Sequence, residues 1–426
     1  MIWTALILAT AVAQDHPARP SPLTLPEALR IFRERGFDLL LAQQQVESAQ
    51  GDLQVAAAIA NPQLSGGLGK SFKYDPGQCA GCSAVQESLG LSDQGAIFDL
   101  LVNKRGLRKD AARAALEAAR LSRADAQRTL EFQLKQQFLQ AALAAAQARF
   151  AREAMESTAR TRDLMQRRYG AGAVSEADLA KTEVAALEAE QQLDQAQAQF
   201  ASARAAVVFL LGAEEPQQAL ELDTAALDFR AGAVAVSSFD TLYTQALGAR
   251  PDLRAIDRQI ERAEAALALA RRQRFPDLQL SATYTQEGTG NIALTPPTLS
   301  LGVSLGLPVF YQQQGEIRRA EADLRIQTLQ RGKLRAQVAL EVAQAFSAFE
   351  SGQKLVERMQ GKLLERAQRA RDLARIQYEK GASSLLELLD AERTYIAVHG
   401  EYVQDLSIYW TAVAQLEQAA GKDLRQ

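Results

Sequence analysis

The chain has 426 residues, of which 47% are hydrophobic and 23% charged, and its net charge is −3. This composition excludes a disordered tail and a basic nucleic-acid-binding protein, so we expect no nucleic acid among its partners. Aromatic residues make up only 6% of the chain and alanine is frequent, which favours long helix-on-helix surfaces over one bulky core.

The first residues, MIWTALILATAVAQDHPARP, have the pattern of an export signal. An apolar run of suitable length is followed by a small-x-small cleavage pattern at Ala11 to Ala13, and then by a polar stretch with prolines. We therefore predict a signal peptide over 1–13. No Lys or Arg precedes the apolar run, and an apolar strand or the start of a buried helix is the alternative.

Long helices are predicted for most of the remaining chain. Residues 107–169 contain neither glycine nor proline and are rich in strong helix formers. At 1.5 Å per residue, such a helix would be about 90 Å long. A second long helical run covers 316–380, and shorter runs cover 175–211 and 384–420. Taken alone, these helices also allow a soluble coiled-coil rod.

The sequence contains an internal repeat. Landmark residues recur after 209 residues in the later part of each half and after 214 in the earlier part. The pairs are Gly172 and Gly381, Glu183 and Glu392, Gly212 and Gly421, Asp38 and Asp252, Ala49 and Ala263, and Pro62 and Pro276. Two copies of one unit therefore make up the chain. The predicted domains are the signal peptide 1–13, a first repeat 14–212 with strands 62–74 and 83–93, a joining segment 213–238, and a second repeat 239–426 with strands 276–287 and 297–309.

The four predicted strands alternate apolar with small polar residues. This period of two, over about 10 residues, matches the strands of outer-membrane barrels. We predict that the apolar face contacts outer-membrane lipid; in the second repeat this face comprises Leu278, Leu280, Leu299, Leu301, Val303 and Leu305. A four-stranded sheet half buried on a soluble domain is the alternative. The serine, threonine and glycine on the second face favour a water-filled lumen.

A membrane location would require several chains. After the N-terminus, no segment supplies the ~18 to 20 consecutive apolar residues of a membrane-spanning helix, so the strands would have to cross the membrane. Four strands cannot close a barrel, because the smallest membrane barrels have about eight. An open edge in lipid would cost several kcal/mol per unpaired backbone group. Each chain would therefore donate four strands to a shared barrel.

Several motifs resemble those of one known family. They are LTLPEALRIF at Leu23, NPQLSGGLG at Asn61, YGAGAVSEADLAKTE at Tyr169 and YEKGASSLLELLDAERT at Tyr378. Together with the doubled layout, they resemble the TolC-like outer membrane efflux proteins over almost the whole mature chain. The general character is closer to the heavy-metal cation efflux branch than to the drug branch.

The resemblance implies a fold and a function. The fold would be mainly α with a β-barrel part: a homotrimer with a twelve-stranded barrel in the outer membrane of a Gram-negative bacterium and an α-barrel in the periplasm. The protein would be a passive exit duct that docks through a periplasmic adaptor onto an inner-membrane pump, which we expect to be of the resistance-nodulation-division type. It would be neither an enzyme nor a cofactor protein. A soluble periplasmic helical adaptor or scaffold is the alternative.

The resemblance also assigns roles at the periplasmic tip. The turns after Tyr169 and Tyr378 would meet the adaptor. The residues assigned to these turns are Gly172, Ala173, Gly381 and Ala382. The residues assigned to the gate are Asp178, Tyr378, Glu387 and Asp390. Ser383 stands where TolC has a latch arginine, so one salt bridge of that latch is expected to be missing. From spacing alone, the three carboxylates could equally be ordinary solvated helix charges.

The chain has two cysteines, Cys79 and Cys82, in the predicted loop between the first two strands. In an oxidising compartment we expect a local disulfide or a minor loop feature. Metal binding and redox catalysis are less favoured, because His16 and His399 are far apart in the sequence and no Cys or His cluster completes a site.

Overall fold

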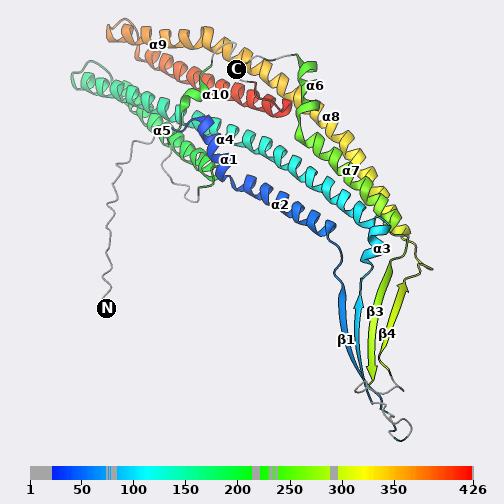
Figure 1. The fold of residues 1–426 in the computed structure, drawn as a ribbon. Helices are drawn as coiled ribbons and strands as arrows, with labels where there is room; N and C mark the ends of the chain where they lie inside the picture. Colours follow the sequence, from blue (N-terminus) through cyan, green and yellow to red (C-terminus); the bar gives the residue numbers. More distant parts are fainter. Residues whose placement is uncertain are drawn as a thin grey trace, which may run out of the picture. The chain divides into compact units, whose positions relative to one another are not determined.

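The computed structural model describes residues 22–72, 75, 77, 84–213, 221–229, 234, 236, 238–287 and 296–424 (Figure 1). The predicted signal peptide and the Cys79 and Cys82 pair lie outside the described residues. The chain forms two compact units, and each unit combines segments of both sequence repeats. Unit 1 contains the described parts of Met1–Leu40, Gln127–Ala249 and Ala339–Gln426, and unit 2 contains those of Leu41–Ala126 and Arg250–Val338.

Helices dominate the described residues, and four strands accompany them. The helices are α1 (Leu25–Arg35), α2 (Phe37–Ala57), α3 (Ala96–Leu101), α4 (Lys104–Gly170), α5 (Glu176–Leu210), the 3-10 turn η1 (Thr224–Leu227), α6 (Phe239–Ala249), α7 (Pro251–Arg272), α8 (Gln314–Arg358), the π-helical turn η2 (Met359–Leu363), α9 (Leu364–Glu379) and α10 (Leu385–Ala420). The strands are β1 (Gln63–Lys70), β2 (Val85–Ser92), β3 (Leu278–Glu287) and β4 (Thr298–Leu305).

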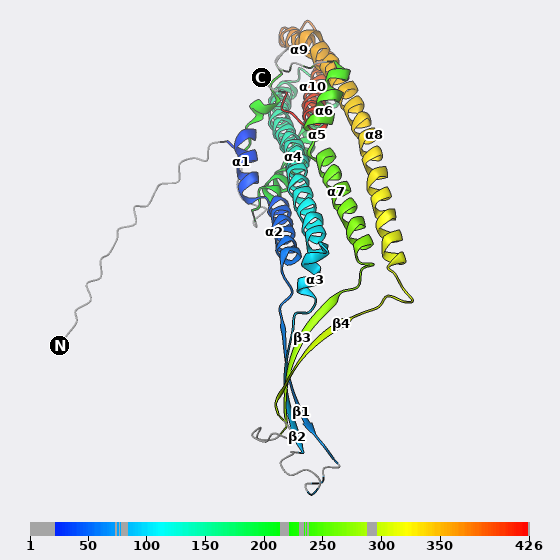
Figure 2. The ribbon, with the colours of Figure 1, turned by 45° about the vertical axis from the view of Figure 1, so that its right-hand side comes forward.

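The four strands form one antiparallel sheet in the order β1-β2-β3-β4 (Figure 2). The central pairing, β2 with β3, joins a strand of the first repeat to a strand of the second. All four strands lie inside the ranges expected from the alternating pattern. Strand β4 ends at Leu305, before Pro308, which has no backbone N–H for a strand ladder.

The second long helical run is not a uniform α-helix. It divides into α8 and α9 around the π-helical turn η2, which includes Gly361. In contrast, α4 continues as one α-helix for 67 residues, because its sequence has no proline and its glycines, Gly106 and Gly170, lie near its ends.

The core of unit 1 forms where helices cover one another's apolar stripes. Helix α1 contributes Phe32, which is fully buried in a cluster with Leu134 and Phe138 of α4 and Val207 of α5. This packing explains why short α1 is stable, since a helix of about this length is marginal alone in water.

A second set of contacts ties α10 into unit 1. The Trp410 indole donates a hydrogen bond to the Leu227 carbonyl of η1 at 3.1 Å. Helix α8 approaches α10 closely at Gly352, where an added Cβ would lie 3.1 Å from the Cα of Tyr409. The C-terminal half of α10 is therefore a buried element of unit 1.

In unit 2, two consecutive basic residues hold both helix-to-strand connections. Lys104, which is 4% exposed, donates to the Phe275 carbonyl and to Asp277 Oδ1, each at 2.7 Å. Arg105 Nε donates to the Ala57 carbonyl at 2.7 Å. The start of α4 thus anchors the chain that leads into β3 and the chain that leaves α2 towards β1.

Candidate functional site

The sheet has one apolar face, and the register brings the predicted lipid-facing residues onto it. Leu278 pairs with Leu305 and Leu280 with Val303. Leu299 and Leu301 continue the same face opposite Tyr284 and Ala282 of β3. Leu301 is 81% exposed and Val303 is 68% exposed. Aliphatic side chains exposed to this extent on one contiguous face mark a surface that something apolar covers.

The opposite face of the sheet carries small polar residues in cross-strand pairs. Three serine hydroxyls each donate to the carbonyl of a glycine on the neighbouring strand at 3.4 Å. The donor and acceptor pairs are Ser65 and Gly90, Ser88 and Gly67, and Ser281 and Gly302. A Cβ added to any of these glycines would lie 2.6 to 2.7 Å from the serine oxygen. The glycines therefore leave room for the serine hydroxyls, and this face of the sheet carries only small, hydrophilic groups at these positions.

The two hairpin ends in unit 1 use the same backbone turn. Gly172 has φ 71° and Gly381 has φ 74°, both in the left-handed region that favours glycine. The Ala173 N–H donates to the Arg168 carbonyl at 2.9 Å, and the Ala382 N–H donates to the Gln377 carbonyl at 2.8 Å. All four predicted tip residues are exposed. The 209-residue repeat is thus a repeat of backbone geometry at these turns.

Two of the predicted gate carboxylates occupy helix-capping positions. Ser175 caps α5, and its hydroxyl donates to Asp178 Oδ2 at 2.8 Å while it accepts from the Asp178 N–H at 3.2 Å. Ser384 caps α10 in a full capping box, in which Glu387 Oε2 accepts from the Ser384 N–H at 3.3 Å. Both carboxylates therefore have a structural role at a helix N-terminus.

The charge around these carboxylates differs between the hairpins. The hydroxyl of Ser175, and after it Lys181 at 3.5 Å, hold the pKa of Asp178 below its usual value. The residue that corresponds to Lys181 in the second hairpin is Asp390, which is exposed and one turn after Glu387. At these two corresponding positions α10 carries two carboxylates and α5 carries an ion pair, although Glu176 adds a further carboxylate to the first turn of α5.

Tyr378 is buried between the two hairpins. It is 7% exposed and packs with Met165 of α4 and with Leu385 and Leu388 of α10. Its hydroxyl lies 2.7 Å from Met165 Sδ, and the Arg168 guanidinium lies 5.0 Å from its ring centroid. The structure thus places Tyr378 at a contact between hairpins, while Asp178, Glu387 and Asp390 lie at helix starts beside the turns.

Sequence reasoning did not assign a role to Glu392 of α10. This carboxylate is 7% exposed, and its Oε2 atom has no hydrogen-bond partner among the described residues. Burial raises its pKa, and Arg375 and Arg371 oppose that rise. The available signal was heptad spacing: Leu385, Leu388 and Tyr395 form an apolar stripe on α10 that Glu392 interrupts.

The described residues hold neither a metal-binding cluster nor a membrane-spanning helix. No three His, Cys, Asp or Glu side chains among them gather in a way that could hold a metal ion. None of the helices in the described part of the chain combines the length and apolar content needed to cross a membrane.

Comparison with known proteins decides the family. A family model described as "Outer membrane efflux protein" matches residues 28–213 and 242–422, which is most of the chain. The chain is an outer membrane efflux protein. The family resemblance predicted from the motifs is therefore confirmed. As a member of this family, the protein is a transport duct of the outer membrane that extends into the periplasm, and it is not an enzyme.

Two relatives of this efflux protein are named for different cargoes. It is 28% identical over 414 residues to the cobalt-zinc-cadmium resistance protein CzcC of Cupriavidus metallidurans. The aligned region covers 94% of this chain and 90% of CzcC. It is 29% identical over 397 residues to the pyoverdine export outer membrane protein OpmQ of Pseudomonas aeruginosa. The aligned region covers 86% of this chain and 78% of OpmQ.

A solved structure confirms the fold class of this efflux protein. The Campylobacter jejuni CmeC outer membrane channel matches with a TM-score of 0.77 at 17% identity, over 98% of this chain and 91% of CmeC. The predicted fold, mainly helical with four strands per chain, is thus that of a TolC-like channel.

Proposed function

We propose that three copies of this efflux protein assemble into one duct, with a shared barrel in the outer membrane and a helical tunnel in the periplasm. The sheet carries the proposal, because its apolar face is exposed and its outer strands, β1 and β4, each pair on one side only among the described residues. In lipid, both open edges would leave backbone groups unpaired at several kcal/mol each. Pairing β4 of one copy with β1 of the next removes every edge.

The two faces of β4 provide the test of this assembly. Val303 and Ser304 are neighbours that face opposite sides of the sheet, and we assign Val303 to lipid and Ser304 to the lumen. Arginine on the lipid face costs about 2 to 4 kcal/mol in each chain. We expect V303R to lose trimers that resist detergent on a gel, and S304R to keep them. Equal trimer yields would overturn the face assignment, and a monomeric parent protein would overturn the assembly.

The exposed tip turns are the proposed contact for a periplasmic adaptor. The turn residues Gly172, Ala173, Gly381 and Ala382 are exposed, and their backbone N–H groups donate hydrogen bonds within the turns, so each turn offers a well-defined exposed surface. We place the constriction beside them, at Asp178, Tyr378, Glu387 and Asp390. In a trimer, Glu387 and Asp390 would form two stacked rings of like charge, which favour cations. Through the adaptor, the duct would serve an inner-membrane pump of the resistance-nodulation-division type.

We propose divalent metal cations as the cargo. The support is the match to CzcC, which extends over more of both chains than the match to OpmQ, together with the two carboxylates at the start of α10. Deleting the gene should lower the concentrations of cobalt, zinc and cadmium that arrest growth, and the plasmid-borne gene should restore them. If the deletion strain were sensitive only to a siderophore or to organic dyes and antibiotics, the proposal that metals are the cargo would be wrong. The proposal that the protein is a duct would still stand.

A further inference from the structure

A buried carboxylate lies in the contact between α4 and α10. The Phe150 ring of α4 stacks on His399 of α10 with centroids 3.7 Å apart, and it meets Tyr395 edge-on at 5.7 Å. Glu392 lies on the same side of α10, one turn before Tyr395 and Ile396. A carboxylate in such a contact costs free energy unless it is paired or protonated.

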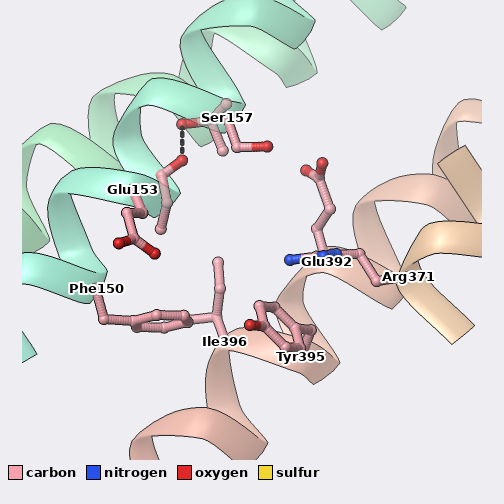
Figure 3. A pocket seen from close by; sticks show the side chains of 9 residues that line it. Phe150, Glu153, Ser157, Arg371, Glu392, Tyr395 and Ile396 are labelled. Atoms are coloured by element: carbon pink, nitrogen blue, oxygen red, sulfur yellow. Dashed lines mark hydrogen bonds between the residues drawn. The ribbon is translucent and has the colours of Figure 1, made fainter. Parts of the chain in front are cut away.

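Glu392 points into a small cavity (Figure 3). The cavity has a volume of about 60 Å³ and is lined by α4, α9 and α10. The Ser157 hydroxyl of α4 points towards the Glu392 carboxylate across it (Figure 3). This space is large enough for a few water molecules and too small for a drug-sized ligand.

Arg371 of α9, a cation that lines the cavity, is engaged elsewhere. Its Nε and Nη2 atoms lie 3.0 and 2.7 Å from Asp372 Oδ1. Its guanidinium also lies 4.1 Å from the centroid of the Tyr395 ring. Arg371 therefore lowers the pKa of Glu392 only through space, as the second of two opposing charges.

The other charged groups around the cavity also leave Glu392 unpaired. Arg375 of α9 bonds Glu379 at 3.3 Å, and Glu153 of α4 adds a second carboxylate to the cavity wall. Burial dominates, so the pKa of Glu392 stands above its ordinary value. Packing against α4 therefore favours the neutral acid more than exposure to water does.

We propose that Glu392 is a proton-controlled lock in this contact: the neutral acid lets α9 and α10 pack on α4, and the carboxylate weakens that packing. The direction follows from linkage. The packed state holds the proton more tightly than a loosened, hydrated state, so acid favours packing. Loosening should increase about tenfold per pH unit from the ordinary glutamate pKa, ~4.3, up to the raised pKa of Glu392, and then level off. The effect of the lock on a channel rests on the proposed function, but the packing change itself does not.

The repeat supplies a matched control. Glu183 of α5 is the counterpart of Glu392, 209 residues earlier, and its side chain is exposed. Arg162 corresponds to Arg371 and bonds its own following residue, Asp163, in the same way. Glu183→Gln therefore removes the same charge from an equivalent local setting without touching a buried contact.

Hydrogen exchange of the full-length protein in detergent tests the lock. Amide protection of peptides from 385–399 is compared between pH 4.5 and 8, after correction for intrinsic exchange rates. In the parent and in E183Q, corrected protection should fall with rising pH, and in E392Q this fall should be lost. A pH dependence of E392Q equal to that of the parent would overturn the proposal.

A second variant covers the case in which E392Q fails to fold. Arg371→Gln removes a nearby cation, so it should raise the pKa of Glu392 further and extend the loss of protection to higher pH. The proposal would be contradicted if the pH midpoint of the loss of protection were unchanged or lower in this variant. Single-channel recordings over the same pH range then test the proposed function separately, because a lock that exchange confirms could be present in a protein that fails to conduct.

Discussion

Unit 1 has two helical hairpins, one formed by α4 and α5 and the other by α9 and α10. Their turns have the same backbone conformation, but their side chains make different contacts. Gly172 and Gly381 turn the chain with nearly equal φ, 71° and 74°. Yet Tyr378 is 7% exposed, and its counterpart Tyr169 is 42% exposed. Duplication has thus preserved the local signals of the turn, while packing has diverged.

Charge has diverged in the same way. Asp178 pairs with Lys181 one turn into α5, whereas α10 begins with the two carboxylates Glu387 and Asp390. Residues 175–181 also contain Glu176 and carry a net charge of −1, whereas residues 384–390 carry −2, so on a shared backbone the start of α10 is the more acidic. Four experiments, ordered by the size of the effect that we expect, test this difference between the hairpins.

The largest difference should come from the tyrosines. Tyr378→Ala removes a buried ring between hairpins and should lower the free energy of unfolding by about 3 to 5 kcal/mol, as for other buried aromatic residues. Tyr169→Ala should change it by less than about 0.5 kcal/mol. Thermal unfolding followed by circular dichroism in detergent measures both, and equal losses would show that the asymmetry of burial is wrong.

The glycines should respond alike. Gly172→Ala and Gly381→Ala each force alanine into the left-handed region, at about 1 to 2 kcal/mol. No atom lies within 4 Å of an added Cβ at either position, so backbone strain is the whole cost. The same unfolding assay applies. A variant that loses no stability would mean that its turn differs from its partner's.

The serine caps should differ slightly. Ser175→Ala and Ser384→Ala each remove a helix cap worth about 1 kcal/mol. The loss at Ser175 should be the larger, because its hydroxyl also donates to Asp178 Oδ2, whereas the Glu387 carboxylate accepts from the Ser384 backbone N–H, which alanine keeps. Hydrogen exchange of the first turns of α5 and α10 resolves the two effects. A greater loss at Ser384 would contradict this ranking.

The acidic helix start should affect ion preference and leave stability nearly unchanged. In planar-bilayer recordings, Glu387→Gln with Asp390→Asn should weaken cation preference and block by multivalent cations. The matched change Asp178→Asn with Lys181→Gln keeps the local net charge constant and should alter both far less. Unchanged selectivity in the first double variant would leave Glu387 and Asp390 as ordinary solvated helix charges.

Much of the fold could be predicted because its signals are local in sequence. The long helix without proline became α4, and the alternation of Leu299, Leu301 and Val303 with small polar residues became one apolar face of β4. Gly361 did not by itself indicate the π-helical turn η2, because a glycine is compatible with either helix type and only the surrounding packing selects one.

The amino-acid sequence is sufficient to infer the duplicated layout, the helices, the four alternating strands and the turns at Gly172 and Gly381, because periodicity and backbone preference depend on residues close along the chain. Which copy of a repeated residue is buried depends instead on how the helices pack. Tyr378 packs on Met165 while Tyr169 faces outwards, and Glu392 is enclosed while Glu183 is exposed. Burial depends on which neighbouring helix covers a given face, and two nearly equivalent stretches of sequence leave that choice to the packing of the whole unit.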